Sequence, residues 1–435
     1  MNPEFRRQLW LQFSTTRLIL LPLLLAACFA AAYLSATSEP AKPMVPTAMF
    51  LFAALVFGMG TLAAGSSVMD EISDRTWDQQ RMSAMKPWAM TWGKLAGASA
   101  YAWYGGALCL LVAVPGALTR EAPAYVGKAA LAAIFAGVML HAFLIAINLQ
   151  MLKAGSRVTR RGGAWVLFLL LILGSSVVTT TLRGESIRWW NQTFARQDFA
   201  LASLALFAVC ALVAAWRSMA EALAVRQLPW GWPLLALVAT AYISGFAWGQ
   251  PSAVVGVVGL SVCAVLTYFA LLTEPQQQPL WQRVLNRAHD RQWRALLLQL
   301  PRWPTSLLLV FPFAGICALA LNPETSGPGY LSNAVLVQPI AFAFLVARDC
   351  ALALVLAFWP QSRKPVVSFA VLMLVLYALL PWLLRAIGGP VLAALVLPLI
   401  GSSAVSVGIA AIHLGLAVWL LRWRWLANTP HIAAD

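Results

Sequence analysis

Charge is scarce in this chain. Lys, Arg, Asp and Glu make up 10% of the 435 residues, whereas hydrophobic residues make up 61%. A soluble protein has about 25% charged residues, so this composition cannot supply the polar surface that a soluble core would need. The apolar runs are continuous and reach the ~20 residues of a spanning helix, unlike the ~10-residue alternating segments of a barrel. The sequence therefore predicts an all-α integral membrane protein, a polytopic helical bundle.

Motifs for several chemistries are also missing. The chain contains no G-x-x-x-x-G-K-[ST] phosphate loop, and the Gly-Lys of "WGKLAG" at 92–97 lacks the first glycine and the hydroxyl residue. The 6 cysteines lie in or at the ends of apolar runs without any C-x-x-C, which indicates buried thiols rather than disulfides or zinc ligands. We therefore expect no catalytic residue, metal or cofactor in this chain.

Acidic residues are fewer than basic ones, and the net charge is +15. In a membrane protein this excess is best explained by Lys and Arg that hold loops on the cytoplasmic side and meet anionic lipid. We therefore expect a lipid bilayer, and no nucleic acid, as the partner of these charges.

The apolar runs predict about twelve spans. They lie at 17–35, 48–69, 95–118, 129–152, 163–182, 198–216, 230–248, 252–273, 304–321, 333–347, 366–384 and 403–421. With the N-terminus inside, the external segments hold only a minority of the 30 Lys and Arg, namely Lys42, Arg120, Lys128, Arg183, Arg188, Arg196 and Arg385. This bias predicts a multi-pass protein of the cell inner membrane with both termini cytoplasmic.

The N-terminal segment has an echo later in the chain. "RQLWLQF" at 7–13 and "RALLLQL" at 294–300 each combine a basic residue, an apolar stripe and a Gln before a span. Each predicts an amphipathic helix at the interface. We expect a six-span unit at 1–226, two further spans at 227–280 and a C-terminal membrane unit at 281–435 that begins with the second amphipathic helix. A duplication and a common feature of helices entering membranes both remain open explanations of the echo.

One loop concentrates charge. The segment "MDEISDRTWDQQRMSAMKPWAMTWGKL" at 69–95 lies between two spans, and the charge bias places it in the cytosol. Its acidic residues favour the start of a helix. Trp77 and Trp88 are large side chains of the kind that dominate interfaces, and Arg81 and Lys86 suit acidic groups of a partner. From composition alone, a solvated, charged loop without a partner is the favoured explanation.

The loop resembles the cytoplasmic segment of permeases of type-2 ATP-binding-cassette (ABC-2) transporters. Their pattern has acidic residues, G-T-W-[DE]-x-L, then R-L-S-P-x-S-P-W, and G-K-L as the third span begins. Two positions depart from it: Arg75 stands where the pattern has Gly, and Ala84 where it often has Pro. The matching positions here are Glu71, Asp74, Thr76, Trp77, Asp78, Arg81, Ser83, Pro87, Trp88, Gly93, Lys94 and Leu95.

The resemblance covers residues 1–226 and implies the membrane-spanning subunit of an exporter without an ATPase of its own. A separate cytoplasmic ATP-binding subunit, as a dimer, is then expected to dock on the coupling loop 70–94. A second permease chain is a further expected partner if the C-terminal unit is only an appendage. The residues expected to contact the ATPase are Glu71, Asp74, Arg75, Trp77, Asp78, Arg81, Lys86 and Trp88.

Ionisable residues near or within the spans offer two alternatives. Arg348 and Asp349 are expected either at the cytoplasmic end of the tenth span or as a second contact for a cytoplasmic partner. His141 and His413 are expected to be packing residues. A membrane-embedded transferase would need such groups gathered at one membrane face, and a non-catalytic scaffold would need none. Both functions remain alternatives to the exporter subunit.

Overall fold

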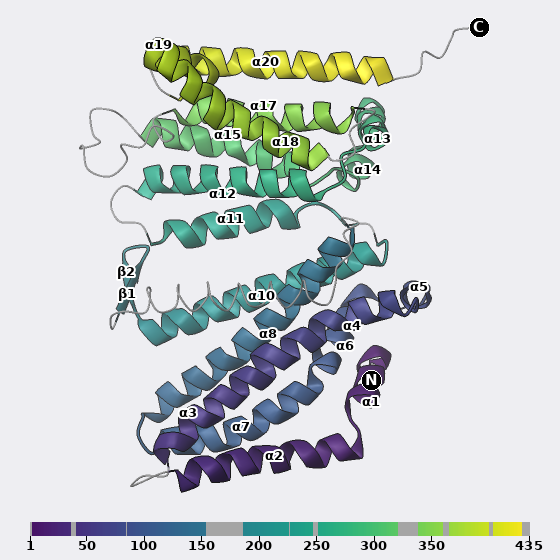
Figure 1. The fold of residues 1–435 in the computed structure, drawn as a ribbon, viewed down its shortest axis with the longest axis vertical. Coiled ribbons are helices and arrows are strands. Elements are labelled where there is room, and N and C mark those ends of the chain that lie inside the picture. Colours follow the sequence, from purple (N-terminus) through teal and green to yellow (C-terminus); the bar gives the residue numbers. More distant parts are fainter. Residues whose placement is uncertain are drawn as a thin grey trace. The chain divides into compact units, whose positions relative to one another are not determined.

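The computed structural model describes residues 2–35, 41–83, 85–153, 186–225, 227–246, 251–320, 338–359, 365–399 and 403–428. The chain divides into two compact units. Unit 1 comprises Met1–Arg188 and Gln192–Gln227, and unit 2 comprises Trp189–Asn191 and Leu228–Asp435. Figure 1 shows that both consist almost entirely of helices, apart from the hairpin of β1 (Ser186–Trp189) and β2 (Gln192–Ala195).

Unit 1 begins with a short helix, α1, which precedes the long apolar helices. Asn2 caps it by accepting hydrogen bonds from the Glu4 and Phe5 amides, and Pro3 at its first position suits a helix start. The helices of unit 1 are α1 (Pro3–Gln12), α2 (Thr15–Leu34), α3 (Ala41–Phe52), the π-helix η1 (Ala53–Gly60), α4 (Thr61–Ser73), α5 (Trp77–Arg81), α6 (Pro87–Ala98), α7 (Ala100–Leu118), α8 (Pro123–Lys153) and α10 (Arg196–Ala222).

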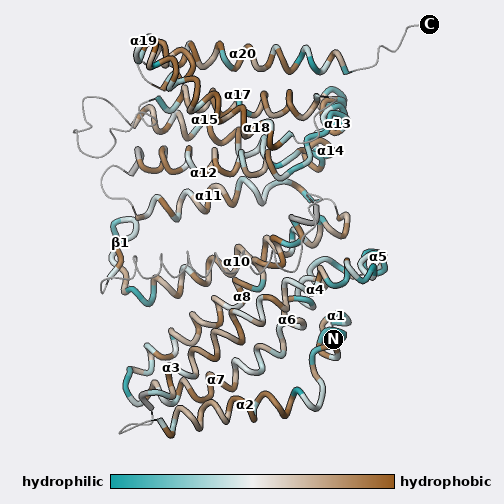
Figure 2. Tube along the Cα trace, in the orientation of Figure 1, coloured by the Kyte–Doolittle hydropathy of each residue, from teal (hydrophilic) through white to brown (hydrophobic). Residues whose placement is uncertain are grey.

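Unit 2 also consists mainly of long apolar helices, and the two short polar helices α13 and α14 lie between them. Figure 2 shows hydrophilic residues gathered on α5 of unit 1 and on α13 and α14 of unit 2, while the longer helices are mostly hydrophobic. The helices of unit 2 are α11 (Gly231–Ser244), α12 (Pro251–Thr273), α13 (Gln278–His289), α14 (Trp293–Leu297), α15 (Trp303–Ala320), α17 (Pro339–Ala357), α18 (Pro365–Leu374), the π-helix η2 (Val375–Leu379), α19 (Leu380–Val396) and α20 (Ser403–Asn428).

The protein is an all-α polytopic membrane protein. Within the described residues, 10 helices are long and apolar enough to cross a membrane, and α11 is a shorter apolar helix. The expected span at 163–182 lies outside the described residues, as do Ala84 and part of the span expected at 333–347. That last span is placed differently, because α17 continues to Ala357 without a break at 347.

The expected second amphipathic segment also differs from the structure. Residues 294–300 belong largely to the five-residue helix α14, and the longer amphipathic helix α13 precedes it. The division between the units lies at residues 227 and 228, so the two spans expected separately at 227–280 fall within unit 2.

Small residues bring the spans of unit 1 together. The core around α4, α6, α8 and α10 contains Ala64, Ala142, Ala146, Ala211 and Ala215, which are almost completely buried. Close backbone approach of this kind is the main source of helix association in membranes, where apolar side chains gain little by leaving lipid. This core lies directly beneath the charged loop, because Val68, Trp77, Met90 and Leu95 belong to it as well.

Candidate functional site

The charged loop begins where α4 ends in a left-handed turn. The Thr76 amide donates to the Glu71 carbonyl (2.9 Å), and the Arg75 amide donates to the Ile72 carbonyl (3.2 Å). Arg75 has φ 58°, a conformation that favours glycine. Arg75 stands where the ABC-2 pattern has Gly, and the backbone at this position has the turn for which glycine is preferred.

Trp77, expected as an anchor for a partner, faces inward. It begins α5, its side chain is 7% exposed, and it packs in the core with Val68 and Met90. The Lys94 ammonium lies 5.9 Å from its ring centroid, within the range of a cation–π contact. Trp77 therefore anchors α5 to the core of unit 1, and its ring is not part of the exposed surface of the loop.

A buried ionic cluster joins α1, α4 and α6. Lys94 of α6 is completely buried and donates to Glu4 Oε1 (3.1 Å) and to Glu71 Oε2. Arg7 donates to Glu4 Oε2 through Nε (3.0 Å), to Glu4 Oε1 through Nη2 (2.9 Å), and to Glu71. The two negative charges of the cluster are matched by two positive charges, and buried charges need such opposite partners. The sequence analysis placed Glu71 on the docking surface, whereas the structure uses it inside this cluster.

The ionic cluster strongly favours the charged form of the Glu4 carboxylate. Burial by itself would raise the pKa of Glu4, but hydrogen bonds from Arg7 and Gln8 and the positive charges of Lys94 and Arg7 outweigh it. The pKa of Glu4 is thereby lowered to about 2. The hydrogen bond with Glu4 likewise raises the pKa of Arg7, against the effect of burial. Glu4 and Arg7 thus stabilise each other within α1, and Lys94 joins Glu4 to α6.

Two glycines explain how α1 approaches α6 so closely. A Cβ atom on Gly93 would lie 2.7 Å from Glu4 Cβ, and one on Gly97 would lie 2.5 Å from Gln8 Cβ. Their spacing of four places both on one face of α6, as in the small-xxx-small pattern of membrane helices. The "GKL" of the loop therefore has a structural explanation, with Gly93 admitting α1 and Lys94 binding its carboxylate.

The turn after α4, together with α5 and the residues up to α6, forms a corner, and the outer surface of this corner carries most of the residues expected to dock. Met82 is 80% exposed and Trp88 51% exposed. Arg81 Nη1 lies 3.5 Å from Asp78 Oδ1 one turn away, and the side chains are 44% and 82% exposed, respectively. The predicted contact residues that are exposed are Asp74, Arg75, Asp78, Arg81, Lys86 and Trp88.

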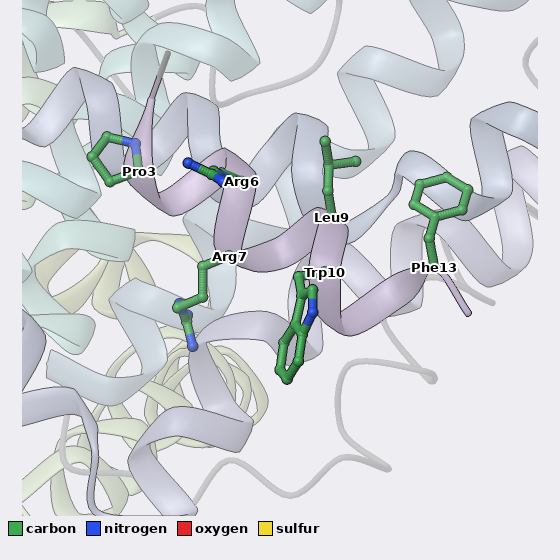
Figure 3. A pocket seen from close by; sticks show the side chains of 6 residues that line it. All are labelled: Pro3, Arg6, Arg7, Leu9, Trp10 and Phe13. Carbon is green, nitrogen blue, oxygen red and sulfur yellow. The ribbon is translucent and has the colours of Figure 1, made fainter. Parts of the chain in front are cut away.

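The outer side of α1 forms a shallow hollow, shown in Figure 3, that Pro3, Arg6, Arg7, Leu9, Trp10 and Phe13 line. Trp10 is 81% exposed. Aromatic rings beside Arg are typical of helices at the headgroup level of a bilayer. This side of α1 therefore suits lipid, while its opposite side, with Glu4 and Gln8, is buried against α6.

Unit 2 contains a second buried charge network, inside its spans. Asp349 is completely buried, and Arg348 is 4% exposed. Arg348 donates to Asp349 Oδ1 through Nε (2.9 Å) and Nη2 (2.8 Å). The hydroxyls of Tyr268 (2.7 Å) and Tyr377 (2.6 Å) both donate to Asp349 Oδ2. His413 Nδ1 lies 3.5 Å from Arg348 Nη1.

Arg348 and Asp349 lie neither at the cytoplasmic end of a span nor at a second contact surface, so both expectations for them are wrong. Both lie in the middle of α17 and are surrounded by α12, η2 and α20, so neither offers a contact to a cytoplasmic partner. The sequence showed two charges beside an apolar run but gave no sign of the two tyrosines, which come from distant segments. Because Asp349 binds four donors, the carboxylate is satisfied within unit 2 and is poorly placed to act on a substrate.

His141 of α8 is a buried polar residue of unit 1. It is completely buried, and its Nε2 lies 2.9 Å from the Val56 carbonyl in η1. Since a carbonyl only accepts, Nε2 carries the proton. A π-helix has i→i+5 instead of i→i+4 backbone hydrogen bonds, and η1 is the element whose Val56 carbonyl contacts His141. The expectation of a packing role agrees with this contact.

Comparison with known proteins gives no relative: no family model, no curated protein and no solved structure matches the chain. Within the described residues, no group of three or more His, Cys, Asp or Glu side chains could hold a metal ion.

Proposed function

We propose that this chain is the membrane-spanning subunit of an ABC exporter of the ABC-2 type, located in the cell inner membrane with both termini cytoplasmic. A separate ATP-binding subunit, present as a dimer, docks on the corner formed by α5 and the residues up to α6. The observation that carries the proposal is the combination of an exposed, charged corner with a buried ionic cluster that ties it to three helices.

The rigid attachment of the corner supports a role in coupling. Trp77 packs α5 into the core, and Glu71 joins α4 to α6 and α1 through Lys94. A displacement of α5 by a partner is therefore transmitted to α4 and α6 together, because separating them would leave charges buried without partners. Helix α4 is the last part of the span Pro43–Ser73, and α6 leads into the span α7, so a movement at the surface reaches the membrane.

The exposed side chains support a protein partner more than simple solvation. Met82 and Trp88 present large apolar surface beside Asp78 and Arg81. Apolar centres with a charged rim are typical of protein interfaces. In this proposal Trp88 and Met82 supply contact area, while Asp78 and Arg81 select the partner by charge.

The test is to purify the tagged chain from its native membrane in mild detergent. We expect a co-purifying subunit with a phosphate-loop sequence, and ATP hydrolysis by the complex. Asp78→Lys is expected to reduce the amount of bound ATP-binding subunit roughly tenfold, the loss typical of an important contact residue. Glu121→Lys, which changes an exposed carboxylate at another connection of unit 1, is the matched control and is expected to retain full binding.

The outcome that contradicts the proposal is a pure, folded chain without an ATP-binding subunit or ATP hydrolysis. Equal binding by the Asp78→Lys and wild-type chains would remove the corner as the docking surface. Trp77→Ala is unsuitable for this test, because loss of its buried ring costs ~3–5 kcal/mol of stability by itself.

A further inference from the structure

The spans of unit 2 repeat the order of the described spans of unit 1. The span Pro43–Ser73 corresponds to α12, α7 to α15, α8 to α17, and α10 to α20. The distances along the chain between the starts of these paired helices are similar but not identical.

Three pairs of positions in these helices and their connections share one separation along the chain. Lys94, the buried cation before α7, corresponds to Arg302, the cation before α15. His141 of α8 corresponds to Asp349 of α17, and both are completely buried. Gly60, whose added Cβ would lie 2.9 Å from His141 Nε2, corresponds to Tyr268, which donates to Asp349. The same pair of positions is therefore in contact in each unit.

An acid–base pair joins the same two elements in both units. In unit 1, Glu71 near the end of α4 binds Lys94 of α6. In unit 2, Glu274 directly after α12 accepts from the Arg302 amide (2.9 Å), and its other oxygen lies 3.4 Å from Arg302 Nε. Each cation also faces an indole ring, since Arg302 lies 5.8 Å from the Trp232 ring centroid. The pair closes the connection between the second and third helices of each unit.

The connection that the pair closes contains the same corner. Asp74-Arg75-Thr76-Trp77 in unit 1 has its counterpart in Asp290-Arg291-Gln292-Trp293. Arg291 has φ 55°, its amide donates to the Ala288 carbonyl (3.1 Å), and the Gln292 amide donates to the Arg287 carbonyl (2.9 Å). A five-residue helix beginning at the Trp follows in both units, α5 and α14. The corner in unit 2 comes later along its connection because α13 precedes it.

The two corners differ in what they expose. Trp77 is buried, whereas Trp293 is 62% exposed and Leu297 42% exposed, beside the exposed Arg291 and Arg294. An exposed Trp beside Arg also occurs on α1, where it suits lipid, so the composition alone does not identify the partner. The position of Trp293 in the corner that corresponds to the docking corner of unit 1 favours a protein partner here. Lys and Arg place both connections on the cytoplasmic side.

We infer that unit 2 is a second copy of the fold of unit 1, and that its α13–α14 corner is a second docking surface for the same class of ATP-binding subunit. One chain then provides both halves of the translocator and binds two ATP-binding subunits without a second permease chain. This inference rests on the proposed function, which supplies the identity of the partner.

The test is the mass of the complex purified from its native membrane, measured by native mass spectrometry. We expect one chain with two ATP-binding subunits. Trp293→Glu is expected to leave one chain with one such subunit, as is Asp78→Lys, and the double variant is expected to bind none. Trp423→Glu changes a Trp of unit 2 with similar exposure, 53%, and is expected to retain two subunits.

Two results overturn the inference while leaving the proposed function intact: a wild-type complex with two copies of this chain, or a Trp293→Glu complex that keeps both ATP-binding subunits. A wild-type chain without any ATP-binding subunit overturns the proposed function itself. Circular dichroism and the elution volume of each variant establish that it is folded before its mass is interpreted.

Discussion

Helices α8 and α17 each bury a polar side chain at the corresponding position, and the two units differ in how they pair it. In unit 1, His141 makes one hydrogen bond to a backbone carbonyl through Nε2, and its buried Nδ1 has no hydrogen-bond partner among the residues that the structure describes. Unit 2 uses a full ion pair whose carboxylate also binds two tyrosines. An unpaired neutral nitrogen costs less to bury than an unpaired charge, so the ion pair depends more strongly on having every partner in place. The comparison indicates that the network of unit 2 holds its helices in a more strictly defined arrangement.

The largest expected effect is that of Asp349→Ala. This change leaves Arg348 buried without its counter-charge, and we expect a loss of ~3–5 kcal/mol in the free energy of unfolding. His141→Leu keeps the volume but leaves the Val56 carbonyl without its donor, for an expected loss of ~1–3 kcal/mol. Reversible unfolding in mixed detergent micelles, followed by tryptophan fluorescence, measures both.

Asp349→Asn is the control for this comparison, because the amide oxygen still accepts hydrogen bonds while the negative charge is lost. We expect it to be less harmful than Asp349→Ala and more harmful than His141→Leu. Equal losses for Asp349→Ala and His141→Leu would contradict the view that the two units differ in kind.

The next prediction concerns pH, to which the ionic cluster around Glu4 and the Asp349 network are expected to respond differently. The folded pKa of Glu4, about 2, lies below its ordinary value of 4.5. Its contribution is therefore complete above about pH 4.5 and is lost as the pH falls toward 2. The linkage amounts to a contribution on the order of 3 kcal/mol to the folded state. Only the part due to Lys94 acts between α1 and α6, because Arg7 and Gln8 lie on α1 itself. Hydrogen exchange of the α1 amides between pH 6 and pH 3 measures the loss of protection, after correction for intrinsic exchange rates.

Glu4→Gln is the control for the acid effect, since it removes the titrating group and should give weak protection at every pH. The amides of α17 are expected to keep their protection over the same range, because their network lies within the spans. Acid-independent protection of α1 in the wild-type protein would contradict the assignment of Glu4 as the group that holds α1.

The sequence predicts the spans well, because hydropathy and length decide them. In the part of the chain that the structure describes, ten helices that can cross a membrane lie at or near the expected ranges. It predicts the burial of polar groups less well. Trp77 and Glu71 look like surface residues in a charged loop, but Trp77 packs in the core with Val68 and Met90. Glu71 turns inward to bind the buried Lys94. Partners that come from distant segments, such as Tyr268 and Tyr377 for Asp349, leave no local pattern to recognise.

The smallest expected effect compares the two corners. Arg75 and Arg291 both occupy the left-handed position after a helix, at φ 58° and 55°. This conformation costs a side chain with a Cβ atom ~1–2 kcal/mol, whereas glycine adopts it freely. Glycine loses ~0.4–1 kcal/mol of this gain through the greater entropy of its unfolded chain. We therefore expect Arg75→Gly and Arg291→Gly each to stabilise its unit by ~0.5–1 kcal/mol in the same unfolding assay.

The alanine variants of the two arginines distinguish backbone from charge. Arg75→Ala and Arg291→Ala remove the guanidinium but keep the Cβ atom, so neither should gain stability if the turn is responsible. A gain for alanine as large as that for glycine would assign the effect to charge repulsion instead. Because the two turns share their φ values and their hydrogen bonds, a gain at one corner without the other would contradict their equivalence, independently of any bound partner.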